Sequence, residues 1–186
     1  MNIVPHLRGR FGRPYTFVDR CASTQRLLDG APEGAVVATD EQTEGRGRLG
    51  RTWHAPAGSS LLFSIVLAPG VAPDRLPKLS LVAGAAVAEA IRAETGLQTS
   101  VKHPNDVLIG GRKVAGILAE SAEGRVVLGI GINVTQTRDE LPADADPGAT
   151  SLALEGAHVD RVELLVSVLE QLEQHYDRWV TSTPGT

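Results

Sequence analysis

The chain has 186 residues, of which 42% are hydrophobic, enough to bury the core of an ordinary domain, so a disordered or fibrous protein is excluded. Its net charge of −4 has the wrong sign for a protein whose whole surface grips nucleic acid. The single cysteine excludes an internal disulfide and favours a reducing compartment. Because no apolar run approaches the roughly 20 residues that span a bilayer, we expect a cytoplasmic protein without membrane association.

The first half of the chain combines short strands with a polar junction and a long loop. Ser23, Thr24 and Gln25 are expected to open a short helix that Gly30 ends, because hydroxyl side chains accept hydrogen bonds from free amides at a helix start. Runs of apolar and β-branched residues predict strands over Tyr15–Asp19, Ala35–Asp40 and Ser60–Ala68. Three polar side chains are therefore expected where the first strand meets the short helix.

The second half predicts two long helices on either side of an antiparallel meander. Small residues recur over Leu76–Glu94 until Gly96, and Asp160 caps a helix over Arg161–Val180. Four strands with tight glycine turns are predicted over Ser100–His103, Val107–Ile109, Val114–Glu120 and Arg125–Val134. The fold class is thus α+β, a mostly antiparallel sheet with helices packed on one face. Residues 1–180 are expected to form a single domain, with 181–186 as a frayed tail.

The segment from Glu41 to Ser59 is rich in glycine and arginine and is predicted to be a loop. Its string GRGRLGRT, residues 45–52, matches two phosphate-binding patterns, but both need a helix directly after the glycines, and Pro56 with Gly58 prevents one. The segment instead predicts a mobile loop whose guanidinium groups fold over an anionic ligand. A solvated basic linker is the alternative.

A second group of candidates surrounds residues 102–118. The chain has 15 arginines but only three lysines, and two of these, Lys102 and Lys113, lie within twelve residues of each other. Lys113 opens an apolar strand, which puts its ammonium at the border of the core, while Asn105 and Asp106 follow a proline, where Asp106 could bind a metal or simply form a turn. Asn133 ends a strand with two interior glycines, which are expected where a ligand or another backbone comes close.

Taken together, these motifs resemble the biotin protein ligases. The stretches STQ (23–25), Gln42, GRGRLGR with Trp53, KHPND (102–106), RKVAGIL (112–118) and GIGIN (129–133) occur in that family's order. The resemblance covers roughly Phe17 to Trp179 and implies the class II aminoacyl-tRNA synthetase-like module shared with lipoate ligases. The chain departs from the family in having His103 where tryptophan is usual. No winged-helix segment is expected before Phe17, and the family's small C-terminal β-barrel domain is expected to be absent.

The resemblance also implies roles for individual residues. Lys113 and Arg48 would be catalytic, facing the biotin carboxylate and the α-phosphate of ATP. The residues implied to bind biotin are Ser23, Thr24, Gln42, Gly45, Arg46, Gly47, Arg48, Lys113 and Gly116. Those implied to bind the nucleotide are Arg48, Arg51, Trp53, Asn105 and Asn133, with Trp53 by the adenine and Asp106 serving Mg²⁺.

The implied activity is ATP-dependent biotinylation of a lysine on a biotin carboxyl carrier protein through biotinyl-5′-adenylate. ATP, Mg²⁺ and biotin are the implied cofactors and substrate, no specific nucleic acid is expected as a partner, and a homodimer is allowed. A lipoate or octanoate ligase or transferase of the same fold is the first alternative. A sensor that binds biotin or a nucleotide without turnover is the second.

Overall fold

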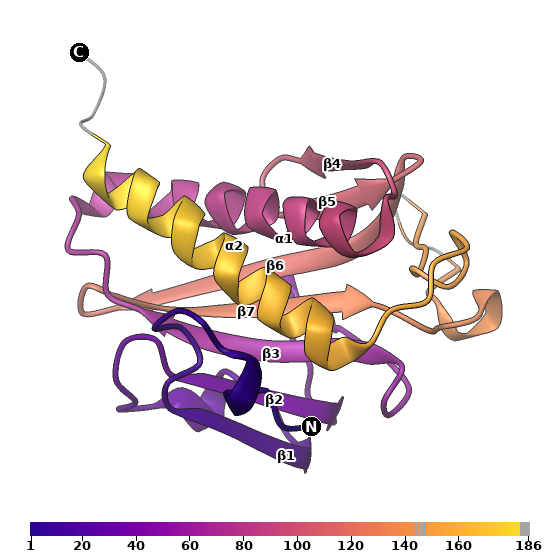
Figure 1. Ribbon diagram of the computed structural model, residues 1–186, viewed down its shortest axis with the longest axis horizontal. Helices are drawn as coiled ribbons and strands as arrows, with labels where there is room; N and C mark the ends of the chain where they lie inside the picture. The colour runs from indigo at the N-terminus through magenta and orange to yellow at the C-terminus, as the bar shows by residue number, and fades with distance from the viewer. Residues whose placement is uncertain (144, 146–147, 183–186) are drawn as a thin grey trace.

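The computed structural model describes residues 1–143, 145 and 148–182, and its centre is one seven-stranded sheet (Figure 1). The strands lie in the order β1-β2-β3-β7-β6-β5-β4. Their bounds are Tyr15–Cys21 (β1), Val36–Gln42 (β2), Ser60–Leu67 (β3), Thr99–Lys102 (β4), Asp106–Ile109 (β5), Arg112–Ala122 (β6) and Arg125–Asn133 (β7). Only β1 and β2 pair in parallel. The predicted mostly antiparallel sheet and each predicted strand are confirmed. The observed strand ends lie within two residues of the predicted ones.

Tight glycine turns produce the meander from β4 to β7. Gly110 and Gly111 both have positive φ angles, 56° and 78°, and join β5 to β6 in two residues. The β6–β7 turn uses Glu123 and Gly124, at φ 51° and 76°. Two-residue hairpins need this left-handed backbone because it matches the twist of the paired strands.

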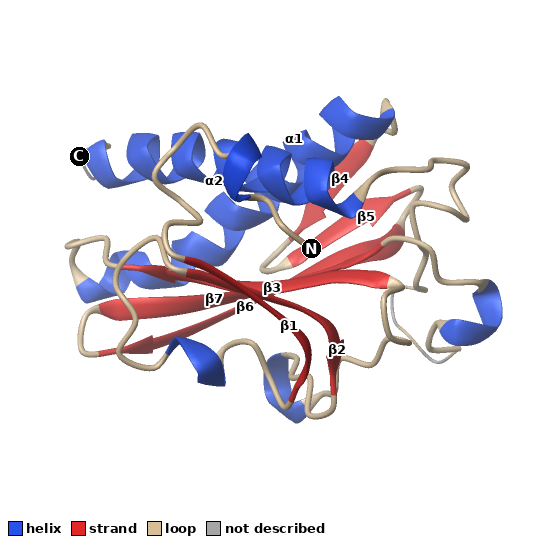
Figure 2. Ribbon diagram, turned by 60° about the horizontal axis from the view of Figure 1, so that its bottom comes forward, coloured by secondary structure: helices blue, strands red, loops and turns tan. Residues whose placement is uncertain are grey.

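Two long helices, α1 (Leu79–Thr95) and α2 (Arg161–Thr181), lie side by side on one face of the sheet (Figures 1 and 2). Gly84 lets α1 approach the sheet, since a Cβ there would stand 3.2 Å from Val101. The carboxylate of Asp160 caps α2 by accepting hydrogen bonds from the amides of Val162 and Glu163. The predicted placement of the helices is therefore confirmed. Among the described residues, no helix has the length and apolarity to cross a membrane.

The helices and sheet bury the main core between them and leave the other face of the central strands free. Side chains of a strand alternate between its faces. In β7, the residues packed in the core are Val126, Leu128, Ile130 and Ile132. The residues that alternate with them on the opposite face are Gly129, Gly131 and Asn133. Because the two glycines carry no side chain, other groups can approach the backbone of β7 closely on that face.

Two predicted segments differ in detail from the structure. The short helix expected from Ser23 is a single 3₁₀ turn, η2 (Arg26–Leu28), formed by hydrogen bonds from the amides of Leu27 and Leu28 to the carbonyls of Thr24 and Gln25. The predicted loop 41–59 begins after β2 and contains a 3₁₀ turn, η3 (Arg48–Gly50), beside an isolated bridge between Arg46 and Thr52. Of the predicted tail 181–186, Thr181 still belongs to α2, and residues 183–186 lie outside the described part.

Three further 3₁₀ turns connect the larger elements. They are η1 (Val4–His6), η4 (Pro73–Lys78) and η5 (Arg138–Glu140). The turn η4 contains Pro77 and ends at Lys78, directly before α1 begins. The segment after β7 returns to the sheet, where Ala149 forms a parallel bridge with Lys113. That return brings residues 148–151 next to the lysine singled out in the sequence.

Candidate functional site

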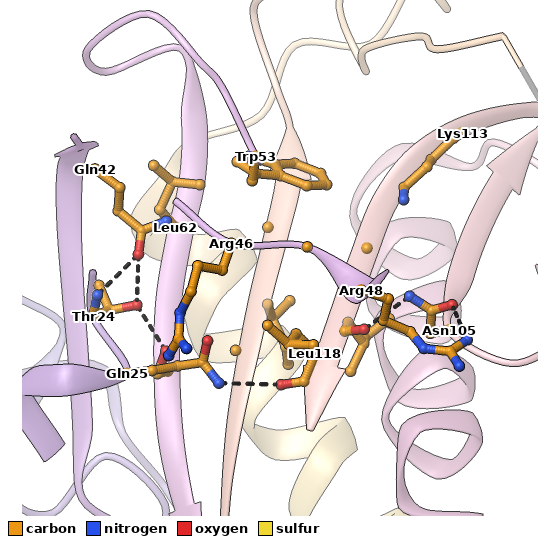
Figure 3. Close-up of a pocket in the computed structure, with 17 residues that line it drawn as sticks. Thr24, Gln25, Gln42, Arg46, Arg48, Trp53, Leu62, Asn105, Lys113 and Leu118 are labelled. Atoms are coloured by element: carbon orange, nitrogen blue, oxygen red, sulfur yellow. Dashed lines mark hydrogen bonds between the residues drawn. The ribbon is translucent and has the colours of Figure 1, made fainter. Parts of the chain in front are cut away.

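A cavity of about 470 Å³, including its open mouth, lies on the face of the sheet opposite α1 and α2. Strands β3, β6 and β7 form its floor, and the loop after β2 forms its roof (Figure 3). The lining residues are Thr24, Gln25, Gln42, Arg46, Gly47, Arg48, Trp53, Leu62, Ser64, Asn105, Lys113, Gly116, Ile117, Leu118, Gly129, Ile130 and Gly131.

One end of the cavity is a buried polar triad. Thr24 Oγ1 lies 2.7 Å from Ser64 Oγ and donates to Gln42 Oε1 over 3.1 Å. The Thr24 amide donates to the same Gln42 oxygen over 2.9 Å. With its oxygen thus occupied, the Gln42 amide nitrogen and the two hydroxyls remain to bind polar groups of a ligand. This end fits a compact polar head group better than an apolar chain.

The floor is flat because glycines there admit side chains from above. A Cβ on Gly131 would stand 2.7 Å from Trp53 Cε2, and one on Gly116 would stand 2.9 Å from Trp53 Cζ3. Gln25 covers Gly129 in the same way, at 3.0 Å. The interior glycines were predicted to allow close approach, and in this structure the approaching groups are Trp53 and Gln25.

Lys113 and Asp106 form an ion pair at the other end of the cavity. Lys113 Nζ lies 2.7 Å from Asp106 Oδ1, although the contact lacks the angles of a regular hydrogen bond. The ammonium also lies 5.6 Å from the centre of the Trp53 ring, within cation–π range. Side-chain exposures of 27% for Lys113 and 18% for Asp106 leave the pair partly screened by protein. The ammonium of Lys113 is thereby held at the cavity wall, where it can bind an anionic group of a ligand.

The arginine loop is closed over the cavity by two polar contacts. Arg46 Nη2 donates to Glu120 Oε2 over 2.7 Å, and Arg48 Nη1 donates to Asn105 Oδ1 over 3.3 Å. Asn105 is itself held by the carbonyl of Ile117, at 3.0 Å. At the loop tip, Leu49 is 87% exposed with a φ angle of 57°. Figure 3 shows both guanidinium groups beneath the loop, on the side of the cavity.

The structure brings most of the predicted residues to one place. The predicted convergence of the arginine loop and Lys113 on a shared cavity is confirmed. Predicted residues that line the cavity are Thr24, Gln42, Arg46, Gly47, Arg48, Trp53, Asn105, Lys113 and Gly116. Asp106 lies behind Lys113 as its ion-pair partner. Their roles toward individual ligands remain predictions.

Four predicted residues lie beside the cavity rather than on its wall. Ser23 is buried, at 2% exposure. Gly45 and Arg51 line an outer groove on the far side of the arginine loop. Asn133 is 5% exposed, and its amide contacts the Thr150 carbonyl and the Gln136 side chain. These residues support the cavity from outside.

Sequence reasoning did not single out several lining residues. Leu62 and Leu118 looked like ordinary strand residues, and Ile117 and Ile130 belong to the core. Ser64 carried a signal, because a hydroxyl in the otherwise apolar run of β3 needs a hydrogen-bond partner once buried. That partner is Thr24.

The remaining titratable groups near the loop do not favour a nucleophile or a metal cage. Cys21 ends β1, and burial raises the pKa of its thiol, so it stays protonated and unreactive. Within the described ranges, no three histidine, cysteine or carboxylate side chains come together in a way that could hold a metal ion. Asp106 is the carboxylate beside Lys113, so a cation at this end would need further ligands from a bound anion.

Comparisons with known proteins agree with this geometry. A family model described as Biotin/lipoate A/B protein ligase family matches residues 17–136. The chain is 38% identical over 181 residues to Bifunctional ligase/repressor BirA of Bacillus subtilis, covering 91% of this chain and 56% of the relative. It is 41% identical over 165 residues to Biotin--[acetyl-CoA-carboxylase] ligase of Mycobacterium tuberculosis, covering 86% and 60%.

A solved structure is similar as well. Biotin protein ligase from Aquifex aeolicus in complex with biotin and ATP superposes with a TM-score of 0.81 at 34% identity, covering 91% of this chain and 72% of that one. The chain spans a little more than half the length of the two curated relatives, 56% and 60%.

Proposed function

Because the chain belongs to the biotin/lipoate A/B protein ligase family, we propose that it carries out the ATP-dependent biotinylation of a lysine on a biotin carboxyl carrier domain. The observation that carries this proposal is the single cavity with a polar triad at one end and a cationic wall at the other. Thr24, Gln42 and Ser64 suit the polar head of biotin, while Lys113 and Arg48 suit its carboxylate. The relative of known structure that contains biotin and ATP supports the choice of ligands.

The first step joins the biotin carboxylate to the α-phosphate of ATP and releases pyrophosphate. Two anions must approach each other, so the enzyme has to position them and offset their repulsion. Lys113 and Arg48 supply that positive charge from the cavity wall, and closure of the loop over bound ligands would strengthen their effect by excluding water. Asn105 orients Arg48 through the 3.3 Å hydrogen bond.

Trp53 offers a surface on which the adenine ring can stack, since its own inner face is occupied by the glycines of β6 and β7. Asp106 is the residue that would hold Mg²⁺, together with phosphate oxygens of the nucleotide. When bound, Mg²⁺ neutralises phosphate charge. Lys113 pairs with this carboxylate, so its ammonium and a bound Mg²⁺ would both offset the negative charge of the phosphates.

In the second step, the amine of the acceptor lysine attacks the acyl carbon of biotinyl-5′-adenylate and AMP leaves. The mixed anhydride must be kept from water until the acceptor arrives. The arginine loop performs this task in the proposal, because its contacts to Glu120 and Asn105 hold it across the cavity. Opening the loop then admits the acceptor.

We further propose a cytoplasmic setting without specific nucleic-acid binding for this chain. The free Cys21 supports a reducing compartment, and the net charge of −4 argues against a nucleic-acid partner. The homodimer allowed by the sequence is an expectation that size-exclusion chromatography with light scattering tests.

A transfer assay tests the proposed activity. The purified chain is incubated with biotin, ATP, Mg²⁺ and a biotin carboxyl carrier domain, and label on the domain is measured by mass spectrometry. The matched control is a carrier domain whose target lysine is replaced by arginine. Biotin on the intact domain alone supports the proposal. Transfer of lipoate instead supports the lipoate ligase alternative, and tight binding of biotin without transfer supports the sensor.

A further inference from the structure

The floor of the cavity leads along the sheet to a second hollow, which we call the recess. The recess lies beside the turn η2, and its space, open mouth included, is about 890 Å³. Its walls include Leu28 of η2 and Val66 and Val127 of the sheet. Among the described residues, Gln25 lines both the recess and the cavity, and no other residue does so. The boundary between the two hollows is therefore at Gln25.

Three rows of facing residues on β3, β7 and β6 show how the recess continues the cavity. The first two rows line the cavity, and they are Leu62, Gly131 and Gly116, then Ser64, Gly129 and Leu118. The third row lines the recess and consists of Val66, Val127 and Glu120. Residues two apart on a strand face the same side of a sheet and lie about 7 Å from each other. The floor of the recess is thus one step further along the same face of the sheet.

The side chain of Gln25 lies across the second row and closes the cavity at this end (Figure 3). A Cβ on Gly129 would stand 3.0 Å from Gln25 Cδ, so the side chain rests directly on the floor. Its Nε2 atom donates to the carbonyls of Leu118, over 3.5 Å, and Val127, over 3.4 Å, one in the second row and one in the third. Gln25 is 8% exposed. Its side chain therefore forms the partition between the cavity and the recess.

An acid whose carboxylate binds at Lys113 extends along this floor toward the partition. Lys113 Nζ lies 3.1 Å from the place of a Cβ on Gly116, in the first row. In the second row, Ser64 belongs to the polar triad that is proposed to hold the head of biotin. In this arrangement biotin ends at the partition, with its head between the triad and Gln25. A straight acyl chain has no polar head for the triad, and a longer one reaches the third row only by passing Gln25.

Resting on the proposed function, we propose that Gln25 is a specificity-determining residue, because its side chain ends the cavity at the length of biotin and excludes acids with longer alkyl chains. With the partition removed, a saturated fatty acid would extend into the recess and bury its end against Leu28, Val66 and Val127. A purely structural role for Gln25 would instead weaken the binding of every acid in the same proportion. Dependence on chain length separates the two roles.

The experiment measures the inhibition constants of two fatty acids that compete with biotin in ATP-dependent pyrophosphate release. Octanoate is shorter than biotin and dodecanoate is longer, so the wild-type chain is expected to bind dodecanoate no more tightly than octanoate. In Gln25→Ala, dodecanoate is expected to bind at least about tenfold more tightly than in the wild-type chain, since each methylene that enters an apolar site is worth about fourfold. The constant for octanoate is expected to change by less than about fourfold, the effect of one methylene.

Gln25→Ser is a second shortened variant, which keeps a hydroxyl near the carbonyls that Gln25 contacts. Gln25→Leu keeps a side chain of similar size without the amide, and it is expected to retain the wild-type preference because the partition stays closed. Leu27→Ala is the matched control. Leu27 is 49% exposed and lines neither hollow, so both inhibition constants are expected to stay at their wild-type values.

The inference is overturned when neither shortened variant binds dodecanoate more tightly, relative to octanoate, than the wild-type chain does. A wild-type chain that already prefers dodecanoate has the same meaning. So does a gain in Gln25→Leu equal to that in Gln25→Ala, because it would show that the size of the side chain does not set the limit.

Failure of the proposed function has a different signature, namely a wild-type chain that releases no pyrophosphate in the presence of biotin. Dissociation constants of octanoate and dodecanoate for the same set of proteins, measured by isothermal titration calorimetry, then test the partition without turnover. The expected order of affinities is the same. A wild-type preference that persists in both shortened variants, or an absence of dodecanoate binding to both, overturns the inference.

Discussion

Lys113 Nζ lies 2.7 Å from Asp106 Oδ1, so the ammonium at the cavity wall is held by a carboxylate. The two residues sit on adjacent strands, β6 and β5, in an antiparallel pair with an irregular register. An arriving anion therefore meets a charge whose position is set in advance, which reduces the reorganisation needed for catalysis.

Replacing Lys113 by methionine tests this charge. Lys113→Met is expected to lower biotin-dependent pyrophosphate release by at least about 100-fold, because removing one preorganised charge-stabilising group typically costs that much or more. Thermal unfolding should show a folded protein, since the side chain is 27% exposed. Lys113→Arg is the comparison: the charge stays but the planar fork differs, so activity should recover only in part. A near-normal rate in Lys113→Met would remove Lys113 from the mechanism.

The contact between Trp53 and the floor predicts the effect of a single methyl group. In Gly131→Ala, the new Cβ would lie 2.7 Å from Trp53 Cε2, so the ring must move. We expect KM for ATP to rise about tenfold, the scale of one aromatic stacking contact. Gly148→Ala is the control, because the space around its Cβ is open. An unchanged KM in Gly131→Ala, with Trp53 fluorescence also unchanged, would contradict the stacking role.

The polar triad predicts a selective loss of biotin binding. Thr24→Val keeps the shape but removes the hydroxyl that contacts Ser64 Oγ at 2.7 Å and Gln42 Oε1 at 3.1 Å. The loss of one buried hydrogen-bonding group is worth about 1–3 kcal/mol, so KM for biotin should rise about five- to 150-fold. KM for ATP should stay within about twofold, since Thr24 lies at the end of the cavity opposite Lys113, where the phosphates are proposed to bind (Figure 3). Thr16→Val, on the exposed edge of β1, controls for the substitution. Equal changes in both constants would argue against a biotin site at Thr24.

The link between the N-terminal segment and α2 predicts an acid-dependent stability. The guanidinium of Arg10 hydrogen-bonds to Asp177, at 3.0 Å, and lowers the pKa of that carboxyl. A lowered folded-state pKa means that the pair stabilises the fold above the ordinary aspartate value of about 4 and that this contribution disappears as the pH falls through the lowered pKa. Since both side chains are about half exposed, the effect should stay below about 1 kcal/mol.

Urea unfolding at neutral pH and at about pH 3 measures how much the Arg10–Asp177 pair contributes to the free energy of unfolding. Asp177→Asn should be less stable than the wild-type chain at neutral pH, and the difference should shrink in acid. Asp29→Asn is the control, because Asp29 makes no ion pair with any described residue. A difference that is constant over this range would exclude the ion pair as its cause.

The secondary structure was largely predictable because its signals are local. Apolar runs, glycine pairs such as Gly110-Gly111 and the cap Asp160 act within a few residues, and the strands and helices follow them closely. The short helix expected at Ser23 was wrong for the opposite reason. Thr24 is held instead by a partner 18 residues away, since its amide and its hydroxyl both donate to Gln42 Oε1, and a local pattern does not contain that contact.

The candidate site was predictable in its members more than in its arrangement. The scarcity of lysine drew attention to Lys113, and the glycine-rich segment to Arg46 and Arg48, because composition alone makes these residues unusual. Nothing in the sequence paired Arg46 with Glu120 or Thr24 with Ser64. Those partners are 74 and 40 residues apart and meet only through the sheet order.

By itself, then, the sequence determined the α+β class, the strand ends to within two residues and the chemical types of the site residues, since these depend on local periodicity and composition. Tertiary structure alone decided which end of the cavity is polar and which is cationic, that Trp53 rests on Gly116 and Gly131, and that Gln136 holds the amide of Asn133. The reason is that strand pairing sets the positions of residues distant in the chain to within a hydrogen-bond length, and a pattern read along one dimension contains no such distances.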